Sequence, residues 1–135
     1  MFKVSGRTDE MVAPMTEHFR TWLRPRLEDG RYFGWFAMTE ERVVAGVGMM
    51  VIDWPPHPSH STQSERGYIL NMYVEPDQRR RGLGGRLMAL CNAEGERRGL
   101  RYMVLHATRQ GRGLYEKLGW QTTTEMALTV ATPTG

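Results

Sequence analysis

The residues best suited to chemistry lie in the stretch VEPDQRRRGLGGRLMAL, residues 74–90, which places three consecutive arginines and three glycines between a strand-like run and a helix-like run. The first turn of a helix leaves backbone N–H groups without intrahelical acceptors, and such groups attract anions. Gly82 and Gly84 lack side chains, so a bulky ligand can approach the main chain, and the neighbouring arginines add positive charge. We therefore predict that the backbone amides of residues 80–85 bind a pyrophosphate.

The sequence on either side predicts the strand and the helix that must position these amides. GYILNMYVEP, residues 67–76, is rich in β-branched and aromatic residues and is predicted to be a strand that Pro76 ends. An apolar stripe at helical spacing follows and predicts a helix from about Gly82 to Arg98, with Gly99 beyond its end. The stripe consists of Leu83, Leu87, Leu90 and Cys91.

Further elements are predicted on both sides. Apolar residues at helical spacing predict a bent helix, or two helices, over residues 14–29, with Pro25 as the kink and Gly30 at the end. YFGWFAM and RVVAGVGMMVI predict two strands joined by a hairpin at TEER. LRYMVLHA predicts a strand, GRGLYEKLG a short helix closed by Gly119, and EMALTV a last strand. The predicted order is helix, three strands, helix, strand, helix, strand.

The glycine-rich turn resembles the motif of a known family. Arg79-x-x-Gly82-x-Gly84 matches neither G-x-G-x-x-G nor a P-loop. It is similar to the Gln/Arg-x-x-Gly-x-Gly/Ala signature of the GCN5-related N-acetyltransferases (GNAT family). GYILNMYVEP looks like the fourth strand of that family, and LYEKLGW looks like its late Tyr-x-x-x-Gly-aromatic segment. The similarity covers residues 32–130.

This resemblance implies a fold and an activity. The fold is of the α/β (α+β) class: a mixed, mostly antiparallel sheet flanked by helices, with central parallel strands that splay apart. The activity is transfer of an acetyl group from acetyl-CoA to a primary amine by direct attack, with no metal. The family usually begins with a further strand and helix, whereas only MFKV precedes the first helix here. The N-terminal part is therefore expected to be short or missing.

The resemblance also implies roles for individual residues. In the family, pantetheine pairs with an exposed strand edge as an added strand would. Tyr115 matches the late tyrosine and is the expected proton donor to the leaving thiolate; without the family match, a packing role would be the better interpretation. The expected cofactor contacts are Met72, Val74, Arg79, Arg80, Arg81, Gly82, Leu83, Gly84, Gly85 and Thr108, the last standing where the family often has asparagine.

The general base is left open. Several side chains are candidates for removing a proton from the ammonium group, directly or through water, and the sequence selects none of them. Asn71 is not a true base, but it could hold a water or shape a strand bulge. The candidates are Asp53, His57, His60, Glu65, Asn71 and His106.

Composition narrows the class of protein. A chain of 135 residues, 40% hydrophobic and 24% charged, is expected to form one domain over residues 1–135. Cys91 is the only cysteine, so no disulfide forms within the chain, and a core position is the expected one. No apolar run approaches the roughly 20 residues of a membrane span, and the N-terminus lacks the apolar centre of a signal peptide. We expect a cytoplasmic protein without a membrane partner.

Two classes of function follow. The first is an acetyl-CoA-dependent N-acetyltransferase that acts on a small molecule, a peptide or a protein. The second is a binding module: a coenzyme A-binding regulatory domain without turnover or, less favoured, a nucleic-acid binder. A formal net charge of +3 is a mild excess, and the three arginines are not interleaved with stacking aromatic residues, so nucleic acid is disfavoured. Trp54 beside PPHP suits the core, an acceptor pocket or a subunit contact, which leaves a homodimer open.

Overall fold

The computed structural model describes residues 9–40 and 42–131, and it describes side chains from residue 16 onward. Along the described chain the elements follow in the order α1 (Asp9–Glu28), β1 (Tyr32–Thr39), β2 (Arg42–Asp53), β3 (Glu65–Val74), the 3-10 helix η2 (Pro76–Gln78), α2 (Leu83–Arg97), β4 (Met103–Leu105) and α3 (Arg109–Lys117). This order agrees with the predicted one up to α3. The predicted role of MFKV lies outside the described residues.

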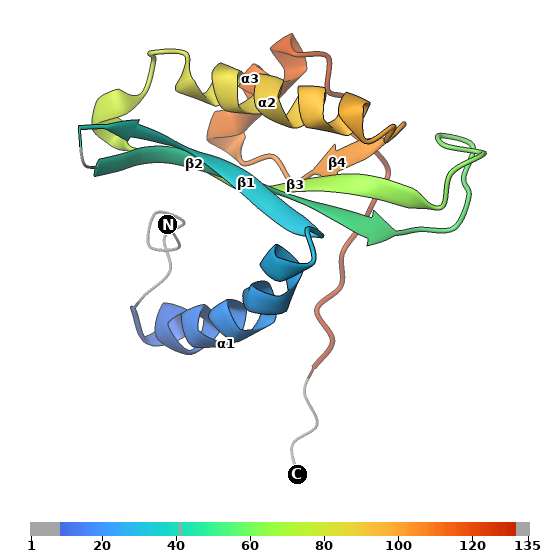
Figure 1. Ribbon diagram of the computed structural model, residues 1–135, viewed down its shortest axis with the longest axis horizontal. Helices are drawn as coiled ribbons and strands as arrows, with labels where there is room; N and C mark the ends of the chain where they lie inside the picture. Colours follow the sequence, from blue (N-terminus) through green and yellow to red (C-terminus); the bar gives the residue numbers. More distant parts are fainter. Residues whose placement is uncertain (1–8, 41, 132–135) are drawn as a thin grey trace.

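The strands form one sheet with the order β1-β2-β3-β4. β1, β2 and β3 are antiparallel neighbours, whereas β4 runs parallel to β3 and pairs with it from Gly67 opposite Met103 to Ile69 opposite Leu105. α2 and α3 cover one face of the sheet, and α1 lies on the other face (Figure 1). The predicted α/β fold, with a mixed sheet flanked by helices, is confirmed.

The main core lies between the sheet and α2. Alternate side chains of β2 point to the same face, which places Met49 against the buried side of α2. Met49 and Cys91 are fully buried, and Ile69 is nearly so. Burial raises the pKa of the Cys91 thiol to about 11. The thiol is therefore protonated at neutral pH and fills the core, as predicted.

α1 is a single helix that contacts the sheet through aromatic rings. It continues through Pro25, whose carbonyl still accepts a hydrogen bond from the Asp29 amide at 3.0 Å, so the predicted kink does not divide it. The rings of Phe19 and Trp22 pack edge-on against Tyr32 of β1, with centroids 6.3 and 6.0 Å away. Gly30 then turns the chain with φ of 79°. The aromatic contacts hold the first strand against α1.

The structure corrects two strand predictions. The strand predicted over LRYMVLHA is reduced to Met103–Leu105. The last strand predicted over EMALTV is wrong, because the described residues 120–131 form no strand. Alternating apolar residues become a strand only where a neighbouring edge supplies hydrogen bonds. The main chain of residues 121–131 has no backbone hydrogen bond to any other part of the described chain.

We predict that Gly34→Ala destabilises the sheet. Gly34 lies opposite Gly48, and a Cβ there would overlap the carbonyl oxygen of Val47. β1 would have to move away from β2, which should lower the free energy of unfolding by about 1–3 kcal/mol. The matched control is Gly113→Ala in α3, where a Cβ meets no atom within 4 Å and should raise stability by about 0.5–1 kcal/mol. Urea unfolding measures both, and equal midpoints would contradict the contact.

Candidate active site

The site begins where β3 and β4 separate. Their pairing ends at Ile69 and Leu105, but β3 continues to Val74 without a β4 partner. A bulge lies just after this point: Gly46 pairs with Tyr73 and Gly48 with Leu70, so β3 has one residue more than β2 in this interval. Asn71 takes up the extra length with φ of 57°. The bulge and the end of β4 leave a wedge beside the C-terminal half of β3.

The free edge of β3 faces this wedge. The amide of Glu75 donates to Val44 of β2 at 2.8 Å. Backbone groups of successive residues in a strand point to opposite sides, so those of Met72 and Val74 point away from β2. The carbonyl of Val74 accepts from the Arg79 guanidinium at 3.2 Å. Met72 and Val74 therefore carry main-chain groups that no strand of the described chain takes up on this side, where an extended ligand could add.

The predicted anion site lies at the end of the same wedge. The turn before α2 takes positive φ values at Arg80 (67°) and at the N-cap Gly82 (78°), and no side chain caps the helix. The amides of Leu83, Gly84 and Gly85 have no acceptor within the described chain. A Cβ at Gly82 or Gly85 would meet no atom within 4 Å, so the space in front of these amides is open.

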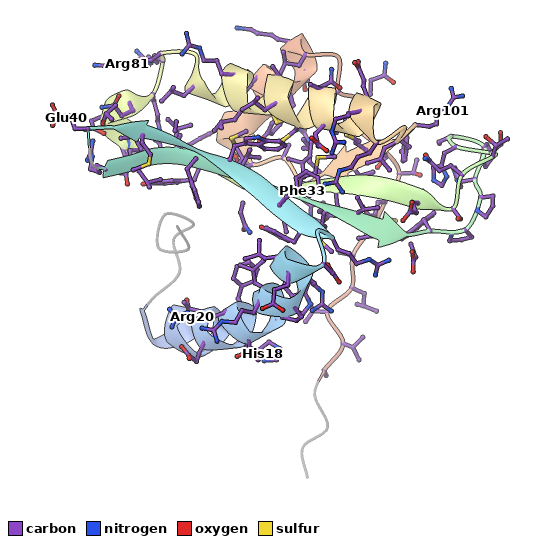
Figure 2. The ribbon with its side chains drawn as sticks, in the orientation of Figure 1. His18, Arg20, Phe33, Glu40, Arg81 and Arg101 are labelled. Atoms are coloured by element: carbon purple, nitrogen blue, oxygen red, sulfur yellow. The ribbon has the colours of Figure 1, made fainter. Side chains whose placement is uncertain are left out.

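Two arginines flank the open amides. Arg80 and Arg81 are exposed. Figure 2 shows Arg81 extending outward from the turn, at the end of the molecule that also carries Glu40 of the β1–β2 hairpin. Both side chains are therefore free to approach an anion bound at the helix start. Arg79 differs, because its guanidinium is already bonded to the Val74 carbonyl.

Thr108 and Tyr115 come from the start and the end of α3. The Thr108 hydroxyl accepts from the Gly111 amide at 3.1 Å and so serves as the N-cap of the helix. Its hydrogen is left to donate to another group. Tyr115 is 7% exposed, and its ring lies against Gly111, where a Cβ would come within 3.0 Å of it. Burial, with a smaller effect of Cys91, raises the pKa of Tyr115, so the phenol is protonated at neutral pH.

A cavity of about 810 Å³ adjoins Tyr115. We call it the α2–β4 cavity. Gly85 and Tyr115 line it, whereas Met72, Val74 and Thr108 do not. The structure therefore brings the predicted residues together in two groups, one along the wedge and the turn, the other in the cavity. Residues from α2, β4, α3 and the segment after α3 line the cavity, among them Met88, Ala89, Met103, Leu105, Trp120 and Met126.

The candidate bases are divided between the two ends of β3. Asn71 lies at the bulge, and His106 follows the end of β4 with Nε2 3.7 Å from a Glu125 oxygen. The others lie at the far end: Asp53 pairs with Glu65 across the sheet and binds Arg31 at 3.3 Å. Only Asn71 and His106 are therefore near the wedge. His57 and His60 belong to the β2–β3 loop at that far end.

The buried histidine of this loop has a structural role. Nε2 of His60 lies 3.0 Å from the Arg66 guanidinium, and its Nδ1 lies 2.9 Å from the Gln63 carbonyl. The Arg66 guanidinium in turn lies 4.0 Å from the Trp54 ring centroid and 4.8 Å from that of Tyr102. Trp54 therefore helps to fix the β2–β3 loop and, at 40% exposed, does not lie in the core.

Tyr32 is a site residue that the sequence analysis missed. Its hydroxyl accepts from the Asn71 amide group at 2.9 Å, directly at the bulge. Tyr32 is 7% exposed, and burial raises its pKa. The residue in the sequence that reflects this contact is Gly48, because a Cβ there would overlap the Tyr32 hydroxyl. A tyrosine facing a glycine across two strands cannot be recognised before the register is known.

Among the described residues, no cluster of three or more histidine, cysteine, aspartate or glutamate side chains could hold a metal ion. No helix in the described part of the chain has the length and apolar character needed to cross a membrane.

Comparison with solved structures gives close matches. A GCN5-related N-acetyltransferase from Ralstonia eutropha JMP134 has 51% identity and a TM-score of 0.91, over 98% of this chain and 86% of that one. A predicted acetyltransferase from Clostridium acetobutylicum, solved with acetyl-CoA, has 27% identity and a TM-score of 0.78, over 84% of this chain and 73% of that one.

A more distant match shares the fold. Glucosamine-6-phosphate N-acetyltransferase from Arabidopsis thaliana has 16% identity and a TM-score of 0.64, over 91% of this chain and 78% of that one.

The search of curated proteins found no match. The model of the acetyltransferase (GNAT) family matches residues 4–120. Since this match spans most of the chain, the protein belongs to the GNAT family of acetyltransferases.

Proposed function

We propose that the protein transfers an acetyl group from acetyl-CoA to a primary amine of a small molecule, a peptide or a protein. The observation that carries this proposal is that a strand edge without a strand partner and a helix start without backbone acceptors follow one another along the chain. The free edge of β3 at Met72 and Val74 leads, through η2, to the open amides of residues 83–85. The first surface suits the amides of pantetheine, and the second suits a pyrophosphate.

The chain would hold the cosubstrate mainly through its backbone. The amides of Leu83, Gly84 and Gly85 would bind the pyrophosphate, with Arg80 and Arg81 adding charge from the side. Gly82 keeps the entrance open. Arg79 would act indirectly, because its bond to Val74 holds the turn against β3. Thr108 has a hydroxyl hydrogen to offer pantetheine while its oxygen caps α3.

The proposed chemistry is direct attack of a neutral amine on the thioester. Nitrogen forms a bond to the carbonyl carbon, the carbon–sulfur bond breaks, and the departing thiolate takes a proton. Tyr115 is the proposed donor of that proton, since burial keeps its phenol protonated. Asn71 and His106 are the base candidates that remain near the wedge. His106 is exposed and would accept a proton directly, whereas Asn71 would hold a water.

The first experiment separates the enzyme from the alternative functions. Purified protein would be incubated with acetyl-CoA and a panel of primary amines, and release of free thiol would be measured. The proposal expects amine-dependent release. Binding of coenzyme A without release for any amine would favour the regulatory module. Tight binding of DNA at physiological salt, without binding of coenzyme A, would favour the nucleic-acid binder. We expect the acceptor to be reached in the cytoplasm.

We predict that Gly85→Leu weakens coenzyme A binding at least about tenfold. The new side chain would enter the open space before the helix amides and exclude the pyrophosphate, which loses several charge-assisted hydrogen bonds. No protein atom lies within 4 Å of a Cβ at Gly85, so the melting temperature without ligand should stay within a few degrees of wild type. The matched control is Ala93→Leu on the same helix. Calorimetry measures affinity, and unchanged affinity in Gly85→Leu would exclude this site.

We predict that Tyr115→Phe lowers turnover by about 10² to 10⁴ with little change in coenzyme A affinity, because the ring remains and only the proton is lost. Burial raises the pKa of Tyr115, so the phenol keeps its proton to higher pH than an exposed tyrosine does. Wild-type activity that depends on this proton should therefore persist until pH exceeds 10.0, the ordinary pKa of tyrosine. Tyr102→Phe is the control. If Tyr115→Phe keeps wild-type turnover, Tyr115 is only a packing residue. If the variant loses coenzyme A affinity in proportion to turnover, the Tyr115 hydroxyl is a ground-state contact to the cosubstrate.

A further inference from the structure

The side-chain amide of Asn71 presents a different atom at each of its two ends. Its nitrogen, Nδ2, donates to the Tyr32 hydroxyl at 2.9 Å. Its oxygen, Oδ1, accepts no hydrogen bond from the described chain. Oδ1 is not enclosed either, because the one enclosed side-chain nitrogen or oxygen without a partner among the described residues is Nε of Arg66. Oδ1 of Asn71 is therefore open to solvent at the bulge of β3.

The Tyr32 hydroxyl is a fixed partner for this amide. The Tyr32 ring is 7% exposed and packs edge-on against Phe19 and Trp22 of α1. The hydroxyl lies over Gly48, where a Cβ would overlap it. A phenol oxygen can accept a hydrogen bond while its own hydrogen points elsewhere. As long as this oxygen accepts from Nδ2, the other end of the Asn71 amide stays on the outer side.

The proposed reaction needs a hydrogen-bond acceptor beside the attacking nitrogen. A protonated primary amine carries only N–H donors, and a water that takes its proton must itself donate to a fixed acceptor. Oδ1 of Asn71 meets either need without taking up a proton. The opposite orientation would present Nδ2 to the amine, so that two sets of donors would face each other. The orientation of this one amide therefore decides whether Asn71 favours the approach of the amine or opposes it.

We propose that Tyr32 is a positioning residue, which fixes the Asn71 amide so that Oδ1 accepts from the attacking amine or from the water that removes its proton. This role rests on the proposed acetyl transfer and deepens it. Asn71 itself stays neutral, because the proton leaves the nitrogen for the water and then for solvent. Tyr32 acts through Asn71, from the face of the sheet on which α1 packs (Figure 1).

The kinetic test removes the Tyr32 hydroxyl and keeps the ring. In Tyr32→Phe the Asn71 amide loses its partner, and kcat with an amine found in the panel should fall about 3- to 10-fold, as for the loss of one hydrogen bond. KM for acetyl-CoA should stay within about twofold, because the free edge of β3 is intact. The control is Tyr102→Phe, which removes a hydroxyl beside the other end of β3 and should keep the wild-type kcat.

Asn71→Asp separates orientation from packing. A carboxylate has two equivalent oxygens, so an acceptor faces outward however the side chain is turned. Aspartate also tolerates the positive φ of this position. When Tyr32→Phe is added to Asn71→Asp, kcat should therefore fall by less than about twofold. A purely structural role of Tyr32 would instead give the same loss of kcat with and without Asn71→Asp.

Nuclear magnetic resonance tests the orientation without any turnover. The chain has two asparagines, and Asn92 on α2 is exposed, so its side-chain amide is an internal reference. In the wild type, the Nδ2 protons of Asn71 should show nuclear Overhauser contacts to the Tyr32 ring. They should also exchange with water at least about tenfold more slowly than those of Asn92. In Tyr32→Phe this difference in exchange rate should disappear.

Three results would each overturn the role of Tyr32. These are wild-type exchange of the Asn71 amide protons as fast as that of Asn92, an unchanged kcat in Tyr32→Phe, and an equal loss of kcat with and without Asn71→Asp. A wild type without amine-dependent thiol release would instead overturn the proposed acetyl transfer itself. The failure of the positioning role and the failure of the proposed function are therefore told apart by different measurements.

Discussion

The separation of β3 from β4 is the constraint on which the proposed site depends. A strand can offer its backbone to a ligand only if no neighbouring strand takes the same groups. Here β4 ends at Leu105 while β3 runs on to Val74, and the bulge at Asn71 shifts the register of β3 at this point. A regular four-stranded sheet of equal strands would have used the main chain of Met72 and Val74 for its own hydrogen bonds.

The bulge is held by a polar contact within an otherwise apolar layer. Asn71 has positive φ, which asparagine tolerates better than most residues, and it donates to the buried hydroxyl of Tyr32. Tyr32 in turn contacts Phe19 and Trp22 of α1. The opening on one side of the sheet is thus tied to the helix that packs on its other face. α1 thereby contributes to the site without reaching it.

The sequence predicted those parts of the fold and of the candidate site that depend on local patterns of residues. The turn at residues 79–85 was recognisable because glycine, arginine and the start of an apolar stripe coincide there, and the order of elements followed from periodicity up to α3. The contact between Tyr32 and Asn71 depends on the register of strands far apart in the chain, which no local pattern contains. EMALTV shows the opposite limit: its alternation is that of a strand, yet it pairs with no strand of the described chain, and Met126, Leu128 and Val130 stay exposed.

The burial of Cys91 has a consequence for redox chemistry. The proposed acetyl transfer from acetyl-CoA would release a free thiol at each turnover, and such a thiol readily forms mixed disulfides with accessible protein thiolates under mild oxidation. Cys91 is fully buried, and its pKa of about 11 leaves almost no thiolate at neutral pH. Burial therefore protects the only cysteine of the chain from such thiols, and thiolation of the folded protein requires the core to open first.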